Sequence, residues 1–161
     1  MSVLTPYNIF KSTLTDGEPA AEAMITGNSD HPNLYGHACF YYTPINGILV
    51  GIEVFGLPDN DNHSHFYGLH IHEFGNCTKP FDKTGSHFNP QNQPHPYHAG
   101  DMPPLLSSDG YAFTIFYDNR LKISDIIGKS IIIHSMRDDF TTQPSGDAGQ
   151  KIGCGIITKS P

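Results

Sequence analysis

Tyr35–Phe55 reads YGHACFYYTPINGILVGIEVF, and β-branched and aromatic residues dominate both of its halves. Between the halves stands the pair Asn46-Gly47, which is typical of the tight turn that joins two antiparallel strands. The stretch therefore predicts a β-hairpin, with one strand over 35–43 and the other over 47–55.

The same kind of segment recurs outward from this hairpin, separated by clusters of Gly, Pro, Asn and Asp. No stretch of a dozen residues repeats apolar positions at helical spacing. Seven or eight short strands favour an all-β fold, a β-sandwich or a small barrel. The further predicted strands cover 20–26, 68–73, 111–117, 130–134 and 153–158.

Length and charge limit what the chain can be. Its 161 residues suit a single domain over 1–161. Sixteen acidic against nine basic residues give a net charge of −7, which argues against nucleic acid or an anionic membrane as a partner. The longest apolar runs, Ile48–Val50 and Ile131–Ile133, are too short to cross a bilayer.

The first ten residues, MSVLTPYNIF, have no basic region, apolar run or small-residue cleavage site. As written, the chain is expected to be cytoplasmic. It is expected to be periplasmic or extracellular if a targeting segment has been removed.

Two long segments, 74–106 and 134–152, are rich in polar and turn-forming residues and fit no strand. Loops of that length in a small domain are usually functional. Both contain or adjoin histidines, which directs attention to metal binding.

His70 and His72 lie two residues apart on a predicted strand, so both side chains point to one face while Ile71 points to the core. His87 and His134 stand in or beside the irregular segments. Sets made of imidazoles favour copper or zinc over calcium or magnesium. Histidines that only cap loops are the alternative.

A second cluster spaces His95, His98 and Asp101 three residues apart. Together with His87 upstream, these residues give three nitrogens and a carboxylate, a closed tetrahedral set of the kind that holds structural zinc. An ordinary polar loop, with Asp101 as a turn residue, is the alternative.

Six motifs in this order resemble the copper/zinc superoxide dismutase family, in particular the variants of Gram-positive bacteria. The resemblance covers the chain from about residue 47 to its end. It implies a Greek-key β-sandwich, or flattened eight-stranded barrel, with two long functional loops. The motifs are GLHIHEFG at 68–75, GSHFNP at 85–90, HAGD at 98–101, IIIH at 131–134, DAG at 147–149 and IGCG at 152–155.

The resemblance assigns a role to each matching position. It implies an oxidoreductase that converts superoxide into oxygen and hydrogen peroxide with copper, beside a structural zinc. His87 would bridge the two metals and move a proton during the reaction. The implied copper ligands are His70, His72, His87 and His134, and the implied zinc ligands are His87, His95, His98 and Asp101.

Three further roles follow from the same resemblance. Asp138 matches an aspartate that links ligands of the two metals. Cys77 and Cys154 match a disulfide that ties the long loop to the last strand. Cys39 has no counterpart in the pattern and is expected to be a small buried apolar residue.

The chain departs from the family at the residues expected to attract substrate. Lys151 stands where the family usually has an arginine, so the charge is kept and the planar fork is lost. Lys151 and Arg137 are the candidate cations for guiding an anion, and a working but slower enzyme is expected. Only two residues separate His95 from His98, a short connection that bears on zinc occupancy, and the segment from His134 to Lys151 is short as well.

Two other functions are compatible with these residues. One is a copper-binding or buffering protein that keeps the site but not fast turnover. The other is a zinc-stabilised structural domain without a redox role. The sequence allows a monomer or a homodimer, with a slight preference for the monomer.

Overall fold

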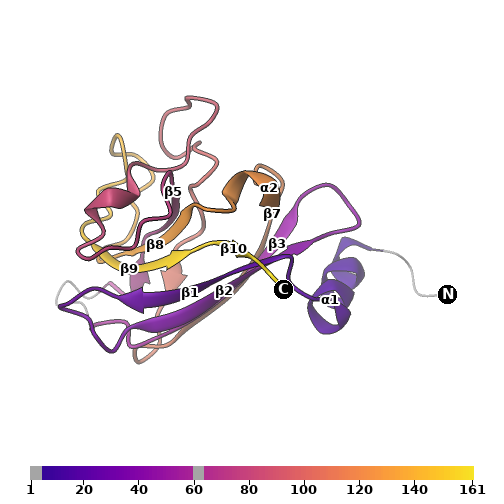
Figure 1. The fold of residues 1–161 in the computed structure, drawn as a ribbon, viewed down its shortest axis with the longest axis horizontal. Coiled ribbons are helices and arrows are strands. Elements are labelled where there is room, and N and C mark those ends of the chain that lie inside the picture. The colour runs from indigo at the N-terminus through magenta and orange to yellow at the C-terminus, as the bar shows by residue number, and fades with distance from the viewer. Residues whose placement is uncertain (1–4, 60–63) are drawn as a thin grey trace.

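In the computed structural model, which describes residues 5–59 and 64–161, one antiparallel sheet curls around the core and long loops cover part of its outside (Figure 1). The first four residues of the segment inspected for a targeting signal lie outside the described range. The helices are α1 (Pro6–Asp16) and α2 (Ile123–Ile126), with a 3₁₀ turn at Asp82–Thr84, and the strands are β1 (Ala21–Gly27), β2 (Tyr35–Tyr42), β3 (Ile48–Phe55), β4 (Phe66–Tyr67), β5 (Leu69–His72), β6 (Leu105–Leu106), β7 (Ala112–Asp118), β8 (Ser130–His134), β9 (Lys151–Ile156) and β10 (Thr158–Lys159).

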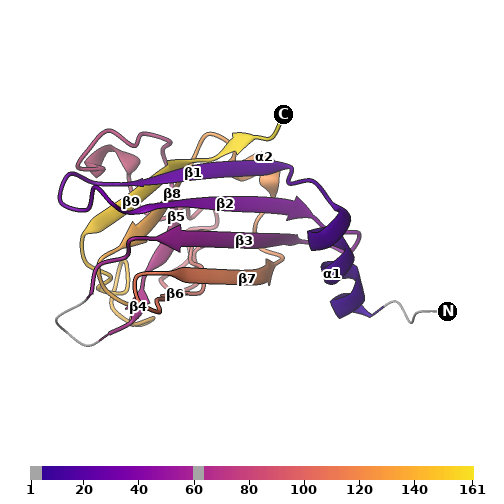
Figure 2. The same cartoon turned by 90° about the horizontal axis from the view of Figure 1, so that it is seen from below.

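The main sheet has eight strands in the order β5-β8-β9-β1-β2-β3-β7, with β10 paired to β1, and β4 and β6 form a separate two-stranded sheet. Figure 2 shows β1, β2, β3 and β7 side by side as one wall. The all-β prediction is confirmed, and the barrel is an open half-barrel made by curling this sheet. All seven predicted strands are present, and each of their ends lies within two residues of its predicted position.

The hairpin of 35–55 forms as its sequence predicts. β2 and β3 pair in register from Tyr35 opposite Phe55 to Tyr42 opposite Ile48, and Gly47 in the turn has a φ of 105°. Alternate residues of β2 point inward, so Ala38 and Phe40 are fully buried in the core. The alternation of buried and exposed residues is what a sheet with one covered face requires.

Helix α1 contradicts the expectation that the chain lacks helical segments. Thr5 caps it by accepting a hydrogen bond from the Asn8 amide, and Pro6 occupies the first turn. A threonine followed by proline is a helix-start signal that does not depend on apolar periodicity. None of the residues of α1 is buried, which is why no apolar stripe marks it. Among the described residues, no helix is long and apolar enough to span a bilayer.

Strands β5 and β8 are buried on both faces. Ile71 and Ile131 point into the main core, as predicted for Ile71. On the opposite face, Ile132 packs with Phe81 and Cys154 under the long loop. This outer face, closed over by loops, is where the paired histidines of β5 lie.

The outer edge of β5 is completed by the loop that follows it. The Ile71 amide donates to the Gly100 carbonyl at 2.9 Å, and the Phe88 amide donates to the Ile71 carbonyl at 2.7 Å. Isolated bridges place His72 beside His87 and His70 beside Asp101. The loop segments around Phe88 and Gly100 thereby pair with β5 like an added strand. This pairing brings His87 and Asp101 beside the histidines of β5.

Candidate metal centre

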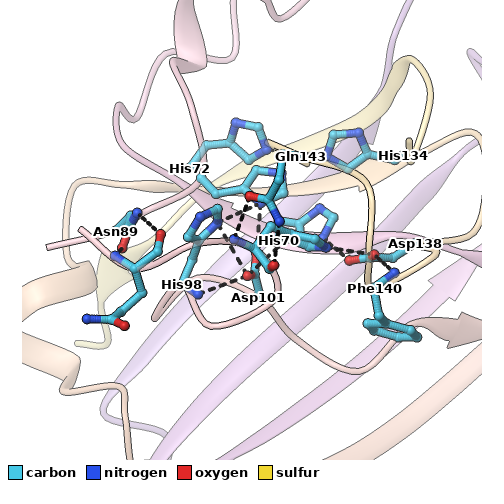
Figure 3. A network of polar contacts seen from close by, with 12 residues as sticks. His70, His72, Asn89, His98, Asp101, His134, Asp138, Phe140 and Gln143 are labelled. Atoms are coloured by element: carbon cyan, nitrogen blue, oxygen red, sulfur yellow. Dashed lines mark hydrogen bonds and ion pairs between the residues drawn. The ribbon is translucent and has the colours of Figure 1, made fainter. Parts of the chain in front are cut away.

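Every residue that the sequence nominated as a metal ligand lies in one buried cluster over β5 and β8. Figure 3 labels five of them, His70, His72, His98, Asp101 and His134. They form two groups that share His87, and all members are buried: His70, His72, His87, His95, His98, Asp101 and His134.

The first group, here called the four-histidine set, consists of His70, His72, His87 and His134, with one nitrogen of each within 4.8 Å of the others. Backbone carbonyls fix the ring tautomers: His72 Nδ1 donates to the Gly85 oxygen at 2.9 Å, and His134 Nδ1 donates to the Gly149 oxygen at 3.2 Å. The two Nε2 atoms are thereby left to face each other at 3.3 Å. A metal-binding histidine commonly donates its other nitrogen in this way.

The second group, here called the mixed set, consists of His87, His95, His98 and Asp101. The Asp101 carboxylate lies 2.8 Å from His87 Nδ1, 3.1 Å from His95 Nδ1 and 3.3 Å from His98 Nδ1. Tetrahedral zinc with bonds of about 2.0 Å separates its ligand atoms by roughly 3.3 Å. The distances to His95 and His98 are close to this value, so the mixed set suits a closed zinc site.

Asp138 joins the two groups. Its Oδ2 accepts from His70 Nε2 at 2.8 Å and its Oδ1 accepts from His95 Nε2 at 2.9 Å. Each ring thus turns its Nδ1 toward its own set. Gly146 packs so closely against the Asp138 carboxylate that a Cβ there would overlap it, and the φ of Gly146 is 69°, a conformation open chiefly to glycine.

The donor atoms are in the protonation state that metals require. Burial, followed by the neighbouring His134, lowers the pKa of His72 to about 2, and burial with His70 lowers the pKa of His134 to about 3. Burial alone would raise the pKa of Asp138, but the hydrogen bonds from His70, the Phe140 amide and His95 hold it at about 2. Near neutral pH the rings are neutral and the carboxylate is charged.

Three buried ring nitrogens make no hydrogen bond with the residues in 5–59 and 64–161: His70 Nδ1, His87 Nε2 and His95 Nδ1, of which the last lies near the Asp101 carboxylate but without the geometry of a hydrogen bond. Leaving such atoms unpaired costs roughly 1–3 kcal/mol each. All three point into a ligand set, so bound metal ions would satisfy them. The residues present therefore fit one metal ion in each set.

Lys151 lines a cavity of about 460 Å³ that opens onto His72, His87 and His134. Its Nζ donates to Thr84 Oγ1 at 2.8 Å and to the Gly85 oxygen at 3.2 Å. Burial lowers the pKa of Lys151. Arg137, the other candidate cation, is exposed and does not line this cavity.

The cysteines pair as the family resemblance implies. Cys77 and Cys154 form a disulfide between the long loop and β9. Cys39 is half-buried rather than buried, because its side chain lies on the outer face of β2 with Sγ 3.6 Å from His37 Nδ1. The expectation of a buried apolar cysteine is wrong for this reason.

Some residues that hold the site could not be predicted from the sequence. Thr84 and Gly85 bind the ammonium of Lys151. Gln143 clamps the backbone of His95, accepting from its amide at 3.0 Å and donating to its carbonyl at 2.7 Å. These partners lie 48 to 67 positions apart in the chain, so no local motif could reveal them.

Known proteins match the chain over most of its length. The family model described as copper/zinc superoxide dismutase (SODC) matches residues 34–157. A copper/zinc superoxide dismutase of Deinococcus radiodurans is 35% identical over 163 aligned residues, which cover 88% of this chain and 85% of that protein. A copper chaperone for superoxide dismutase from Sus scrofa is 34% identical over 107 residues, 58% of this chain and 39% of the chaperone.

Among solved structures, a double mutant of a superoxide dismutase-like protein from Bacillus subtilis superposes with a TM-score of 0.74. It is 30% identical in sequence, and the match covers 85% of this chain and 96% of that one.

Proposed function

Because this chain belongs to the copper/zinc superoxide dismutase family, we propose that it is a superoxide dismutase with copper in the four-histidine set and zinc in the mixed set. The reaction consumes two superoxide anions and two protons and yields one dioxygen and one hydrogen peroxide. Copper, when bound, supplies the one-electron redox chemistry, which zinc lacks. The observation that carries the proposal is the convergence of four buried imidazoles beside a cavity.

His87 is the proposed proton carrier. It belongs to both ligand sets, and it lines the cavity. Its Nδ1 lies against Asp101, while its Nε2, on the side of the four-histidine set, makes no hydrogen bond with the described residues. Nε2 of His87 is therefore available to hold one of the protons that peroxide needs.

Lys151 is the proposed anion guide. The chain carries a net charge of −7, so attraction of an anion has to be local. The ammonium of Lys151 lies in the cavity wall with His72 and His134, and a cation in a concave site of low dielectric focuses the field there.

Asp138 is the proposed positioning residue for both sets. Its two oxygens each bind the Nε2 of one ring, His70 on one side and His95 on the other. Holding those protons away from the sets keeps Nδ1 of each ring available as a ligand.

The test is superoxide decay after pulse radiolysis, with copper and zinc counted in each sample. The wild-type protein is expected to accelerate decay in proportion to its copper content. His134→Ala is expected to lose nearly all of this acceleration, because it removes one of four imidazoles. His37→Ala is the matched control, since His37 lies outside both sets. The proposal is overturned if superoxide decays no faster with fully copper-loaded wild-type protein than in buffer alone.

A copper-holding protein with weak turnover is the second candidate. Two observations favour it: Lys151 replaces the usual arginine, and the relatives of this chain include a copper chaperone. In the same experiment this function predicts tight copper binding with slow decay. Lys151→Arg is then expected to raise that slow rate of decay, because the loss of the arginine is one of the observations on which this candidate rests.

A further inference from the structure

The turn that presents His98 and Asp101 is short and is held partly by itself. The Asp101 amide donates to the His98 carbonyl at 3.2 Å, and the His98 amide donates to Asp101 Oδ2 at 3.0 Å. Both residues are only 6% exposed. Because two residues alone separate His95 from His98, the loop offers little chain of its own to brace this turn.

Arg120 supplies a brace from outside the loop. Its Nη1 donates to the His98 carbonyl at 3.1 Å and its Nη2 donates to the Asp101 carbonyl at 2.6 Å. A single guanidinium therefore grips the first and the last residue of the turn, which are both members of the mixed set. It does so through their backbones, leaving His98 Nδ1 and the Asp101 carboxylate free to face the set.

The guanidinium is itself fixed to the sheet. Asp118, the last residue of β7, is 6% exposed, and its Oδ2 accepts from Arg120 Nη2 at 2.7 Å and from Nε at 3.2 Å. Its Oδ1 accepts from the backbone amides of Arg120 and Leu121. Because Asp118 pairs with Ile48 of β3, the brace transfers the rigidity of the main sheet to the turn.

We propose that Arg120 is a positioning residue for zinc: it holds the turn of His98 and Asp101 in the geometry of the mixed set and so compensates for the short loop. The inference rests on the proposed zinc site. A planar fork with donors in fixed directions can join two carbonyls and a carboxylate at once, and an ammonium cannot reproduce that arrangement. Partners that orient metal ligands typically contribute about 10–100-fold to metal affinity.

The experiment measures Zn²⁺ affinity of the full, copper-free chain by competition with a coloured zinc chelator, with Co²⁺ absorption as a second probe of the mixed set. Arg120→Gln is expected to bind Zn²⁺ about 10–100-fold more weakly and to weaken the tetrahedral Co²⁺ bands. Arg120→Lys is expected to fall between Arg120→Gln and wild type. Lys122→Gln, exposed and two residues away, makes the same charge change and is expected to keep wild-type affinity.

Thermal unfolding of the metal-free variants distinguishes a local effect on the turn of His98 and Asp101 from a loss of stability of the whole fold. The inference is overturned if folded Arg120→Gln binds Zn²⁺ within twofold of wild type, or if Lys122→Gln loses as much. If Arg120→Gln does not fold, Arg120→Lys decides: wild-type affinity in that variant overturns the inference. Wild-type protein that takes up no Zn²⁺ would instead refute the zinc part of the proposed function.

Discussion

Lys151 shows at the scale of one residue how a changed side chain is accommodated. Its ammonium has three N–H donors, and two of its contacts go to Thr84 and to the Gly85 carbonyl. The same Gly85 oxygen also accepts from His72. One N–H donor of Lys151 therefore remains for an anion in the cavity. A guanidinium, with five N–H donors, would offer an anion more of them.

Replacing Lys151 by methionine is expected to slow superoxide decay by about tenfold, the lower end of what electrostatic focusing contributes. The decline of the rate with ionic strength should also become shallower, because the attracting charge is gone. Pulse radiolysis over a series of salt concentrations measures both. Lys159→Met alters the net charge equally from an exposed position on β10, and an equal slowing in that variant would contradict a local role for Lys151.

Single residues also mark the limit of what the sequence predicts. The seven candidate ligands could be named from motifs, because ligand chemistry restricts residue type and spacing, and the structure brings all of them together. Arg137 was named from charge alone and lies outside the cavity. The roles of Gln143 and Arg120 could not be predicted, because contacts of an amide or a guanidinium to a backbone have no sequence motif and arise only in the folded chain.

At the scale of elements, the disulfide is the strongest single link between the long loop and the sheet. Cys77 and Cys154 enclose 77 positions of the chain. Cys154 and Ile132 pack beneath Phe81, with Cys77 against this small cluster. The disulfide therefore fastens the beginning of the loop, at Cys77. The backbone hydrogen bonds of Phe88 and Gly100 to β5 fasten the loop farther along the chain.

Removing the bridge with Cys77→Ser and Cys154→Ser together is expected to lower the free energy of unfolding by about 4 kcal/mol, from the entropy that a loop of this length regains. Urea unfolding of the metal-free proteins measures the loss. Cys39→Ser is the control, since it removes a free thiol and leaves the bridge intact. A double variant no less stable than this control would contradict the assigned contribution.

Elements differ in how well the sequence predicts them. Strands such as β2 and β3 were predictable because burial of one face imposes a period of two and the Asn-Gly turn sets their pairing. The two-residue strands β4, β6 and β10 were not predictable, because they arise only where the folded chain brings two backbone segments together. Helix α1 was missed because its stability lies in its cap and in contacts such as the stacking of Phe10 on Tyr117, 5.1 Å between centroids.

For the whole molecule, the buried histidines make stability depend on pH. His72 and His134 have pKa values of about 2 and about 3 in the folded chain, against an ordinary value of 6.5. Below pH 6.5 the unfolded chain therefore binds protons that the folded chain refuses. Stability of the metal-free protein is fully present above that pH and is lost progressively as the pH falls.

Between pH 7.5 and 5.5 these two rings are expected to lower the free energy of unfolding of the metal-free protein by about 3 kcal/mol. Chelator-treated protein unfolded in urea across this range provides the measurement. His134→Asn should make the dependence shallower, because it removes one of the buried rings whose pKa is lowered. A stability that stays level down to pH 5.5 would contradict the assignment of neutral, buried rings.

The edge of β5 has a consequence for how the chain behaves among other copies of itself. A strand with unpaired amides and carbonyls along one side is a template for association with another chain. Here the segments around Phe88 and Gly100 occupy that side, and the same segments carry His87 and Asp101. The same stretch of backbone therefore carries proposed metal ligands and covers the edge of β5. A chain without bound metals and without the disulfide is expected to expose this edge more readily, and so to aggregate more.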